Sequence, residues 1–267
     1  MNLQTIRGTA AAIARLAGAE LLRRYTQPHT ENTKTTAFDI VTEADTAADA
    51  VIVAALRAAF PDDHIVTEES GGVGAPADGA ARTWYVDPLD GTSNFAAGFP
   101  FFCVSIGLAD SDGSPLVGVV YNPVANEMFT AARGLGAALN GQPLRVSATG
   151  TLQRAMLCTG FPYDYATNPD NNQARWNTVA PRVRGLRCFG AAALELCYVA
   201  AGRLDGQWEA YLRPWDMAAG LLMVAEAGGT VTDFDGGADG LRLGRVVTSN
   251  GHIHAELLAA LAAAHSG

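Results

Sequence analysis

The order of predicted helices and strands changes near residue 150, and this change limits the folds open to the chain. Before it, strands follow one another near 101–109, 115–121, 126–131 and 136–139, split by turns at Asp112-Gly113, Asn122-Pro123 and Asn140-Gly141. After it, strands near 155–159, 186–189, 206–210 and 245–249 alternate with helices near 171–181, 191–201, 215–227 and 252–264. An antiparallel meander followed by such alternation predicts an α+β half joined to an α/β half.

The first hundred residues predict two helices and three short strands. Apolar residues recur at helical spacing over 2–25, and Thr42 with Asp45 can open a second helix that Pro61 ends. Strands are predicted from Phe38 to Val41, from His64 to Thr67 and from Thr83 to Val86. The stretch from Gly71 to Gly79 is rich in Gly, Ala and Pro and is predicted to be a loop.

Composition and charge exclude several classes of protein. With 267 residues, 49% of them hydrophobic, the chain can bury a sizeable core, which argues against intrinsic disorder. It has 18 Lys and Arg against 27 Asp and Glu, a formal charge of −9, and no basic run, so we expect no general nucleic-acid binding. No stretch reaches the roughly 18 apolar residues that span a bilayer. The N-terminus also lacks the regions of a signal peptide, so we expect a cytoplasmic protein without a membrane segment.

Cysteine and histidine spacing does not indicate a metal site. The four cysteines form no CxxC pair and lie in apolar stretches, which favours reduced residues in the core. They are Cys103, Cys158, Cys188 and Cys197. His252 and His254 have no third ligand nearby, so we expect both at the surface.

The strongest local motif runs from Trp84 to Phe95, with the sequence WYVDPLDGTSNF. An apolar strand delivers two carboxylates, Asp87 and Asp90, into a turn that contains Pro and Gly. Carboxylates and backbone carbonyls are the ligands that hard divalent cations prefer. Gly91 permits close approach of a ligand, and a helix that starts at Thr92 would offer free N–H groups to a phosphate. The alternative is an ordinary helix-capping turn, where Asp is common.

Three further acidic features could belong to a functional site, but each also has a purely structural interpretation. Glu68-Glu69 follows a predicted strand, but two adjacent acids are also typical of a solvated loop. Asp216 begins the apolar helix of the PWDMAAG stretch, where an N-cap is the simpler interpretation. The DIVTEAD stretch from Asp39 to Asp45 can be the ordinary start of a charged helix.

Taken together, these four features resemble the inositol monophosphatase family of magnesium-dependent, lithium-sensitive sugar phosphatases. The family pattern is EE at a strand end, then WxxDPxDGTxNF, and later WDxAAG with a trailing EAGG. Here the same elements occur in the same order, as Glu68-Glu69, Trp84 to Phe95, Trp215 to Gly220 and Glu226 to Gly229, preceded by Asp39 to Asp45. The agreement extends from about residue 30 to 250. It implies a layered αβαβα sandwich of the inositol monophosphatase and fructose-1,6-bisphosphatase type. It also implies one domain over 1–267, with a metal-binding half at about 1–148 and an α/β half at about 149–267.

The resemblance implies two or three Mg²⁺ ions in the active site. Glu68, Asp87 and the carbonyl of Leu89 match the ligands of the first ion. Asp87, Asp90 and Asp216 match those of the second, with Asp87 bridging. Such ions hold a water of lowered pKa in line with the ester and neutralise the phosphate, so no nucleophilic Cys or Ser is expected.

Catalytic and substrate-binding roles follow from the same resemblance. Asp45, Glu68 and Thr92 match the catalytic group, with Asp45 and Thr92 orienting the attacking water. Lys34 matches a lysine on the metal-site loop. The positions that match substrate-binding residues are Asp90, Gly91, Thr92, Gly190, Ala191, Ala192, Glu209 and Asp216.

The resemblance implies a phosphatase for a small anionic sugar or polyol phosphate, first of all myo-inositol monophosphate. The alternatives with the same chemistry are fructose 1,6-bisphosphate, histidinol phosphate and NADP. A different class of alternative is a regulatory binding protein on the same fold. Ala191 stands where many bacterial members have Ser, so a polar contact to the substrate is missing there. A homodimer is also expected from the family resemblance.

Overall fold

The computed structural model describes residues 1–27, 31–34, 36, 39–74 and 82–264. The first half begins with the long helix α1, and eight of its strands form one sheet in the order β10-β9-β8-β7-β6-β5-β3-β4. Strands β1 and β2 form a separate antiparallel pair. The elements of this half are α1 (Leu3–Tyr25), β1 (Glu31–Thr33), β2 (Ile40–Thr42), α2 (Glu43–Ala59), β3 (His64–Thr67), β4 (Gly71–Gly74), β5 (Arg82–Asp90), α3 (Thr92–Ala96), β6 (Cys103–Asp110), β7 (Pro115–Asn122), β8 (Glu127–Ala132), β9 (Ala137–Leu139) and β10 (Gln142–Pro143).

The second half contains a five-stranded mixed sheet in the order β12-β11-β13-β15-β14. Strand β11 pairs in parallel with β12 and β13, whereas β15 pairs antiparallel with β13 and β14. The elements here are η1 (Leu152–Arg154), β11 (Met156–Thr159), α4 (Gln173–Val179), η2 (Ala180–Arg182), β12 (Gly185–Arg187), α5 (Ala192–Ala200), β13 (Gly206–Ala210), α6 (Pro214–Glu226), β14 (Thr230–Thr232), α7 (Gly240–Leu243), β15 (Arg245–Ser249) and α8 (His254–Ala263).

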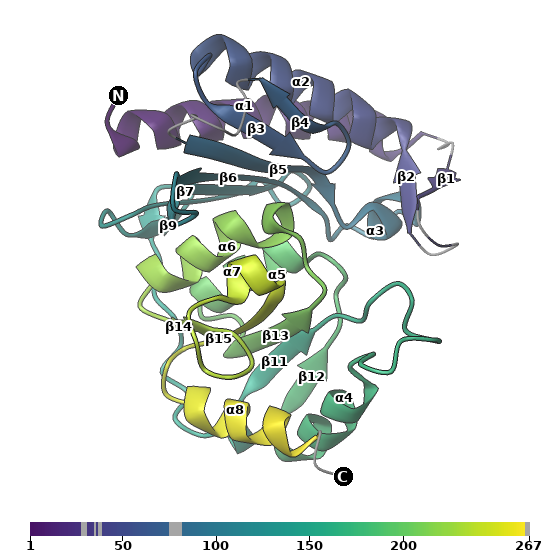
Figure 1. The fold of residues 1–267 in the computed structure, drawn as a ribbon, viewed down its shortest axis with the longest axis vertical. Coiled ribbons are helices and arrows are strands. Elements are labelled where there is room, and N and C mark those ends of the chain that lie inside the picture. Colours follow the sequence, from purple (N-terminus) through teal and green to yellow (C-terminus); the bar gives the residue numbers. More distant parts are fainter. Residues whose placement is uncertain (28–30, 35, 37–38, 75–81, 265–267) are drawn as a thin grey trace.

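These elements stack in five layers (Figure 1). Helices α1 and α2 cover one face of the eight-stranded sheet, and α5 with α6 covers the other. The five-stranded sheet lies below α5 and α6, with α4 and α8 on its far face. The predicted α+β class and αβαβα layering are confirmed, and so is the predicted antiparallel meander, which runs from β6 to β9. Among the described residues, no helix has both the length and the apolar composition needed to cross a membrane.

Several short elements were not predicted from the sequence. Strand β4 lies at Gly71–Gly74, where a loop was predicted. It pairs antiparallel with β3, and its sequence GGVG contains a single side chain beyond hydrogen, Val73, which is too little to form a recognisable pattern. Strand β1, strand β14 and the single-turn helix α7 are likewise too short to show a period. The predicted strand residue Phe38 and the part of the predicted loop at 75–79 lie outside the described residues.

Two predictions about single residues are wrong. Cys188 is exposed, whereas the other three cysteines are buried as predicted and all four are free. His254 is buried rather than at the surface. Its ring nitrogens lie 3.0 Å from the Thr232 hydroxyl and 2.9 Å from the Ser249 hydroxyl. Those two hydroxyls satisfy the ring inside the protein, and residue spacing along one helix gives no sign of them.

Helix α6 approaches the eight-stranded sheet so closely that only glycine fits beneath it. A Cβ atom on Gly107 of β6 would lie 2.8 Å from Cβ of Ala218 and 2.9 Å from the backbone nitrogen of Ala219. A Cβ atom on Gly118 of β7 would lie 2.6 Å from the carbonyl oxygen of Ala219. Because these neighbours are mainly backbone atoms of a buried helix, they cannot rotate away. The two glycines therefore set the height of α6 above the sheet.

We expect Gly118→Ala to destabilise the protein by about 1–3 kcal/mol, because the added methyl group pushes α6 away from β7. Chemical denaturation measures this loss. The matched control is Gly8→Ala in α1, where nothing lies within 4 Å of the added Cβ atom. There the gain in helix propensity should stabilise the protein by about 0.5–1 kcal/mol. Equal unfolding midpoints for Gly118→Ala and the native chain would show that α6 is not held at this height.

Candidate active site

The centre of the site is the irregular end of strand β5. The pairing of β5 with β6 shifts between Asp87 and Asp90, so the chain leaves regular strand geometry there. The Asp87 carboxylate accepts a hydrogen bond from the backbone N–H of Leu89 at 3.0 Å. Gly91 then adopts a φ of +92°, and a Cβ atom there would lie 3.0 Å from the carbonyl oxygen of Phe101. Helix α3 starts at the next residue, so its free N–H groups face the same turn.

Three carboxylates from distant parts of the chain meet at this turn. Ligand oxygens of Glu68, Asp87 and Asp216 all lie within 4.8 Å of one another. Glu68 follows β3, and its backbone N–H donates to the Val86 carbonyl at 3.0 Å, which places it beside β5. Asp216 comes from the first turn of α6. A set made only of carboxylate oxygens could hold a hard divalent cation rather than a thiophilic one.

The protonation of these carboxylates also fits a cation site. Burial, followed by the charges of Glu68, Asp90 and Asp216, raises the pKa of Asp87 well above its usual range. Burial raises the pKa of Asp90 to about 7 against the hydrogen bond from Ala193. Burial also raises the pKa of Asp216 despite the backbone hydrogen bond from Arg213. Without a compensating positive charge, neighbouring acids at this density repel one another and favour protonation. A divalent cation would remove that penalty.

A separate hydrogen-bonded pair lies beside the cluster. The Thr92 hydroxyl is 2.9 Å from Oδ1 of Asp45 and 3.0 Å from the Leu89 carbonyl. Oδ2 of Asp45 accepts hydrogen bonds from the backbone N–H and the hydroxyl of Thr42 at 2.8 and 2.7 Å. These bonds close a capping box at the start of α2 and hold Asp45, which is 1% exposed. Since the Thr92 hydroxyl has one hydrogen for two acceptors, its oxygen is left able to accept another bond.

One cation of the chain already neutralises part of this charge. The Lys34 ammonium lies 2.8 Å from Glu68 and 2.5 Å from Glu69. Burial alone would lower the pKa of Lys34, but the two carboxylates raise it, so the side chain stays charged. Lys34 thus joins the segment after β1 to the acidic end of β3.

The predicted site residues lie around one pocket of about 930 Å³. Its lining includes every predicted site residue except Asp45, which reaches the pocket through the Thr92 hydroxyl. The predicted residues in the lining are Lys34, Glu68, Asp87, Leu89, Asp90, Gly91, Thr92, Gly190, Ala191, Ala192, Glu209 and Asp216. The start of α5 and Glu209 of β13 complete the lining, and α5 also contacts the acids directly, because the backbone N–H of Ala193 donates to Asp90 at 2.8 Å.

Several pocket residues were missed by the sequence analysis. Asn94, Cys188, Glu195 and Arg213 all contribute to the lining. Asn94 lies within the Trp84–Phe95 motif and Arg213 directly before the Trp215–Gly220 motif, so both could have been found there. Cys188 and Glu195 belong to no motif, and only the packing of the second half brings them to the pocket.

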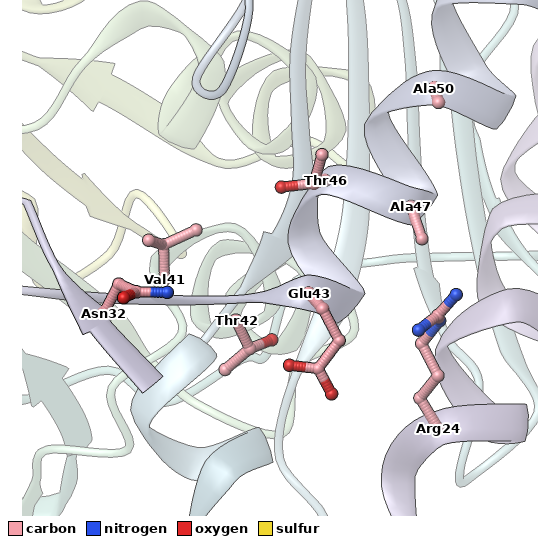
Figure 2. A pocket seen from close by; sticks show the side chains of 8 residues that line it. All are labelled: Arg24, Asn32, Val41, Thr42, Glu43, Thr46, Ala47 and Ala50. Carbon is pink, nitrogen blue, oxygen red and sulfur yellow. The ribbon is translucent and has the colours of Figure 1, made fainter. Parts of the chain in front are cut away.

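A second hollow of about 560 Å³ lies between the end of α1 and the start of α2 (Figure 2). Thr46, Ala47 and Ala50 of α2 form one wall, and the Arg24 side chain extends toward it from α1. Among its described lining residues only Arg24 and Glu43 are charged, and the Arg24 guanidinium already pairs with Glu20 at 2.7 Å. None of the predicted site residues lines this hollow, so the acidic pocket is the candidate active site.

Comparison with known proteins gives consistent matches over nearly the whole chain. A model of the inositol monophosphatase family matches residues 2–266. An inositol-1-monophosphatase from Synechocystis sp. is 45% identical over 262 residues, which cover 98% of this chain and 90% of the relative. A protein named Nus factor SuhB from Pseudomonas aeruginosa is 49% identical over 216 residues, or 80% of this chain and 79% of the relative. A solved inositol monophosphatase from Anabaena has a TM-score of 0.89 at 42% identity, with 98% of this chain and 97% of that one covered.

The raised carboxylate pKa values predict that the metal-free protein loses stability as the pH rises. A carboxyl whose pKa is higher in the folded chain than in the unfolded chain stabilises the fold fully below its unfolded pKa of about 4. That contribution is lost as the pH rises through the folded value, about 7 for Asp90. In a chelator, we therefore expect the melting temperature to fall between pH 5 and pH 8. Added divalent cation should restore it, most at pH 8.

The Asp87→Asn variant tests whether repulsion among the buried carboxylates causes this loss of stability. At pH 8 in chelator the variant should melt at a higher temperature than the native chain, because one buried charge is removed, and it should gain less from added cation. Asp62→Asn, at an exposed position, is the matched control and should follow the native chain. A native chain whose melting temperature does not respond to divalent cation would contradict a metal site in this pocket.

Proposed function

The chain belongs to the inositol monophosphatase family and is a phosphatase, and from this premise we propose that it hydrolyses myo-inositol monophosphate with Mg²⁺ as cofactor. The observation that carries the proposal is the meeting of Glu68, Asp87 and Asp216 within 4.8 Å beside the start of α3. Oxygen ligands are those that Mg²⁺ prefers, and the N–H groups at a helix start suit a phosphate.

We propose that the chain holds two or three Mg²⁺ ions through two overlapping ligand sets. Glu68, Asp87 and the Leu89 carbonyl would form one set, and Asp87, Asp90 and Asp216 the other. When bound, the ions supply a water of lowered pKa and neutralise the phosphate and the departing alkoxide. The high carboxylate pKa values support this assignment, because bound cations would offset the repulsion that raises them.

The protein's own groups would orient the attacking water and the phosphate. Because the Thr92 hydroxyl can donate its hydrogen to Asp45, its oxygen can accept a hydrogen bond from the water. Thr92 and Asp45, with Glu68 at the same end, would thus form the catalytic group. The backbone N–H groups of Gly91 and Thr92 would bind phosphate oxygens. Lys34 would hold Glu68 in place through their ion pair.

The alcohol part of the substrate would lie toward β13 and α5. Glu209 would accept hydrogen bonds from substrate hydroxyls, and Gly190, Ala191 and Ala192 would form the adjoining wall, with Asp90 and Asp216 at the phosphate side. Ala191 offers no side-chain hydroxyl to the substrate. This difference keeps fructose 1,6-bisphosphate, histidinol phosphate and NADP as alternative substrates for the same chemistry.

A regulatory binding role on the same fold is the second candidate. Relatives 41–49% identical to this chain carry the name Nus factor SuhB. The acidic cluster favours catalysis as at least one activity, because a purely binding role does not require three converging carboxylates.

The wider predictions about the chain rest on the family resemblance. We propose that it acts as a homodimer in the cytoplasm and has no general affinity for nucleic acid. We also propose that residues 1–267 form a single domain with halves at about 1–148 and 149–267. Contacts of α6 with β6 and β7 on one side and with β14 and β15 on the other support that unity.

Phosphate release from myo-inositol 1-phosphate tests the proposed reaction. Release should require Mg²⁺, and Asp87→Asn or Asp216→Asn should lower kcat by at least about 100-fold while leaving the fold intact, because each removes a shared or terminal metal ligand. Asp62→Asn should keep full activity. Turnover near the native level in either ligand variant at saturating Mg²⁺ would sink the assignment.

A substrate panel with lithium distinguishes the alternatives. We expect kcat/KM to be highest for inositol monophosphate among inositol monophosphate, fructose 1,6-bisphosphate, histidinol phosphate and NADP. Lithium should inhibit release by competing for a cation position. A preference for another ester would change the substrate and keep the reaction. No release from any ester of the panel would favour the regulatory role.

A further inference from the structure

Glu195 is a buried carboxylate that the proposed reaction does not use. It lies in the first turn of α5 and is 1% exposed. Its Oε1 accepts hydrogen bonds from the backbone N–H groups of Phe189 and Gly190 at 2.9 and 3.1 Å. No ion pair found among the described residues includes it. A carboxylate is costly to bury without a cation, so its position calls for a role beyond packing.

The other oxygen of Glu195 leads to the substrate end of the pocket through one amide. Nε2 of Gln207 lies 3.4 Å from Oε2 of Glu195 and 3.2 Å from Oε2 of Glu209. Gln207 is 0% exposed, and its Oε1 has no hydrogen-bond partner among the described residues. The amide is therefore oriented toward the two carboxylates even though its own oxygen is left unsatisfied, which is a recognised cost for a buried acceptor.

The backbone that Glu195 holds is also part of the pocket wall. The Asn94 side chain donates to the Phe189 carbonyl at 2.7 Å, which joins the segment to α3. Gly190 has a φ of +78°, and a Cβ atom on Gly91 would lie 3.3 Å from its carbonyl oxygen. The segment before α5 thus lies directly against the turn that follows Asp90. A shift of Phe189 and Gly190 would change the shape of the pocket between the phosphate end and Glu209.

We propose that Glu195 is a positioning residue that sets affinity for the alcohol part of the substrate, by fixing Glu209 through Gln207 and by anchoring the backbone of Phe189 and Gly190. This inference rests on the proposed function, in which Glu209 binds substrate hydroxyls. The metal ligands stand on β5, α6 and the end of β3. Glu195 itself bonds to the backbone of Phe189 and Gly190 and to Gln207 rather than to those ligands, so its main effect is on binding of the alcohol.

The dual role explains why a carboxylate is required. Two acceptor oxygens serve two sets of donors, namely the backbone N–H groups and the Gln207 amide. A glutamine at position 195 has a single acceptor oxygen, so its NH₂ group would face either the backbone donors or Nε2 of Gln207. Glu195→Gln can therefore keep only one of the two connections while preserving size and shape.

The test compares a polyol ester with an ester that has no hydroxyl groups on its alcohol. For myo-inositol 1-phosphate, Glu195→Gln should raise KM about tenfold and change kcat less than twofold, because one charged hydrogen-bond connection is lost. For p-nitrophenyl phosphate, both constants should stay within twofold of the native values. Gln207→Leu, which removes the amide but keeps the Glu195 anchor, should also raise KM for the inositol ester. The double variant should show less than the product of the two single effects, because both changes break the same connection.

The matched control is Glu226→Gln, at the C-terminal end of α6. The Glu226 carboxylate also accepts hydrogen bonds from two backbone N–H groups, those of Gly134 and Gly136, both at 2.8 Å, but it does not line the pocket. The Glu226→Gln variant should have the native KM for both esters. Equal losses of kcat for both esters in Glu195→Gln, or an unchanged KM for the inositol ester, would overturn the positioning role.

Amide hydrogen exchange tests the anchor without reference to activity. Glu195→Ala should speed exchange at Phe189 and Gly190 by more than about tenfold, because both N–H groups lose their acceptor. The amides of Cys197 and Val199 report whether α5 itself stays folded. Unchanged exchange at Phe189 and Gly190 would refute the anchor even if the native chain hydrolyses no inositol ester. Conversely, a native chain that releases phosphate from neither ester contradicts the proposed function. In that case the exchange rates of Phe189 and Gly190 still decide whether Glu195 anchors this backbone.

Discussion

Repulsion among buried carboxylates is the constraint on which the rest of this structure depends. Asp87 is 3% exposed, and the charges of Glu68, Asp90 and Asp216 all raise its pKa. In a fold without elements that hold these groups together, the carboxylates would lie apart or be exposed to water. Here they are held together by the end of β5, the end of β3 and the start of α6. When the groups are ionised, that arrangement needs a source of positive charge, which Lys34 supplies in part and bound cations would complete.

The same helix-capping geometry delivers two of the acids from opposite layers. Asp45 accepts a hydrogen bond from the backbone N–H of Thr42 at the start of α2, and Asp216 accepts one from Arg213 at the start of α6. For both residues, capping and a place in the site were competing interpretations of the sequence. The geometry makes them compatible, because an acid in the first helical turn has one oxygen for the backbone and one for the pocket. Gly107 and Gly118 then fix how far α6, the helix that carries Asp216, stands from β6 and β7.

The sequence predicts one end of the pocket better than the other, for a physical reason. Asp87, Leu89, Asp90, Gly91 and Thr92 are neighbours in the chain, so a strand followed by a turn and a helix start brings them together locally. Their grouping could be predicted from residue types and spacing. Glu195 and Gln207 meet only because α5 packs on β13, and the buried position of His254 depends on hydroxyls of β14 and β15. Neither contact leaves a period or motif in the sequence. Strand β4 escaped for a related reason, since backbone pairing of glycines has no side-chain signature.

The same difference between local and long-range contacts distinguishes the residues proposed for the reaction from those proposed to bind the alcohol of the substrate. The groups that face the phosphate are set by short segments whose geometry depends on a few neighbouring residues, and such segments keep their form when the surrounding surface changes. The groups that face the alcohol depend on the packing of α5, β13 and the segment before α5. At that end a single substitution such as Ser to Ala at position 191, or a changed partner for Gln207, alters the hydrogen bonds offered to the substrate without disturbing the acidic cluster. A chain of this kind can therefore retain its phosphatase chemistry while its preference among alcohols shifts through buried residues outside every motif.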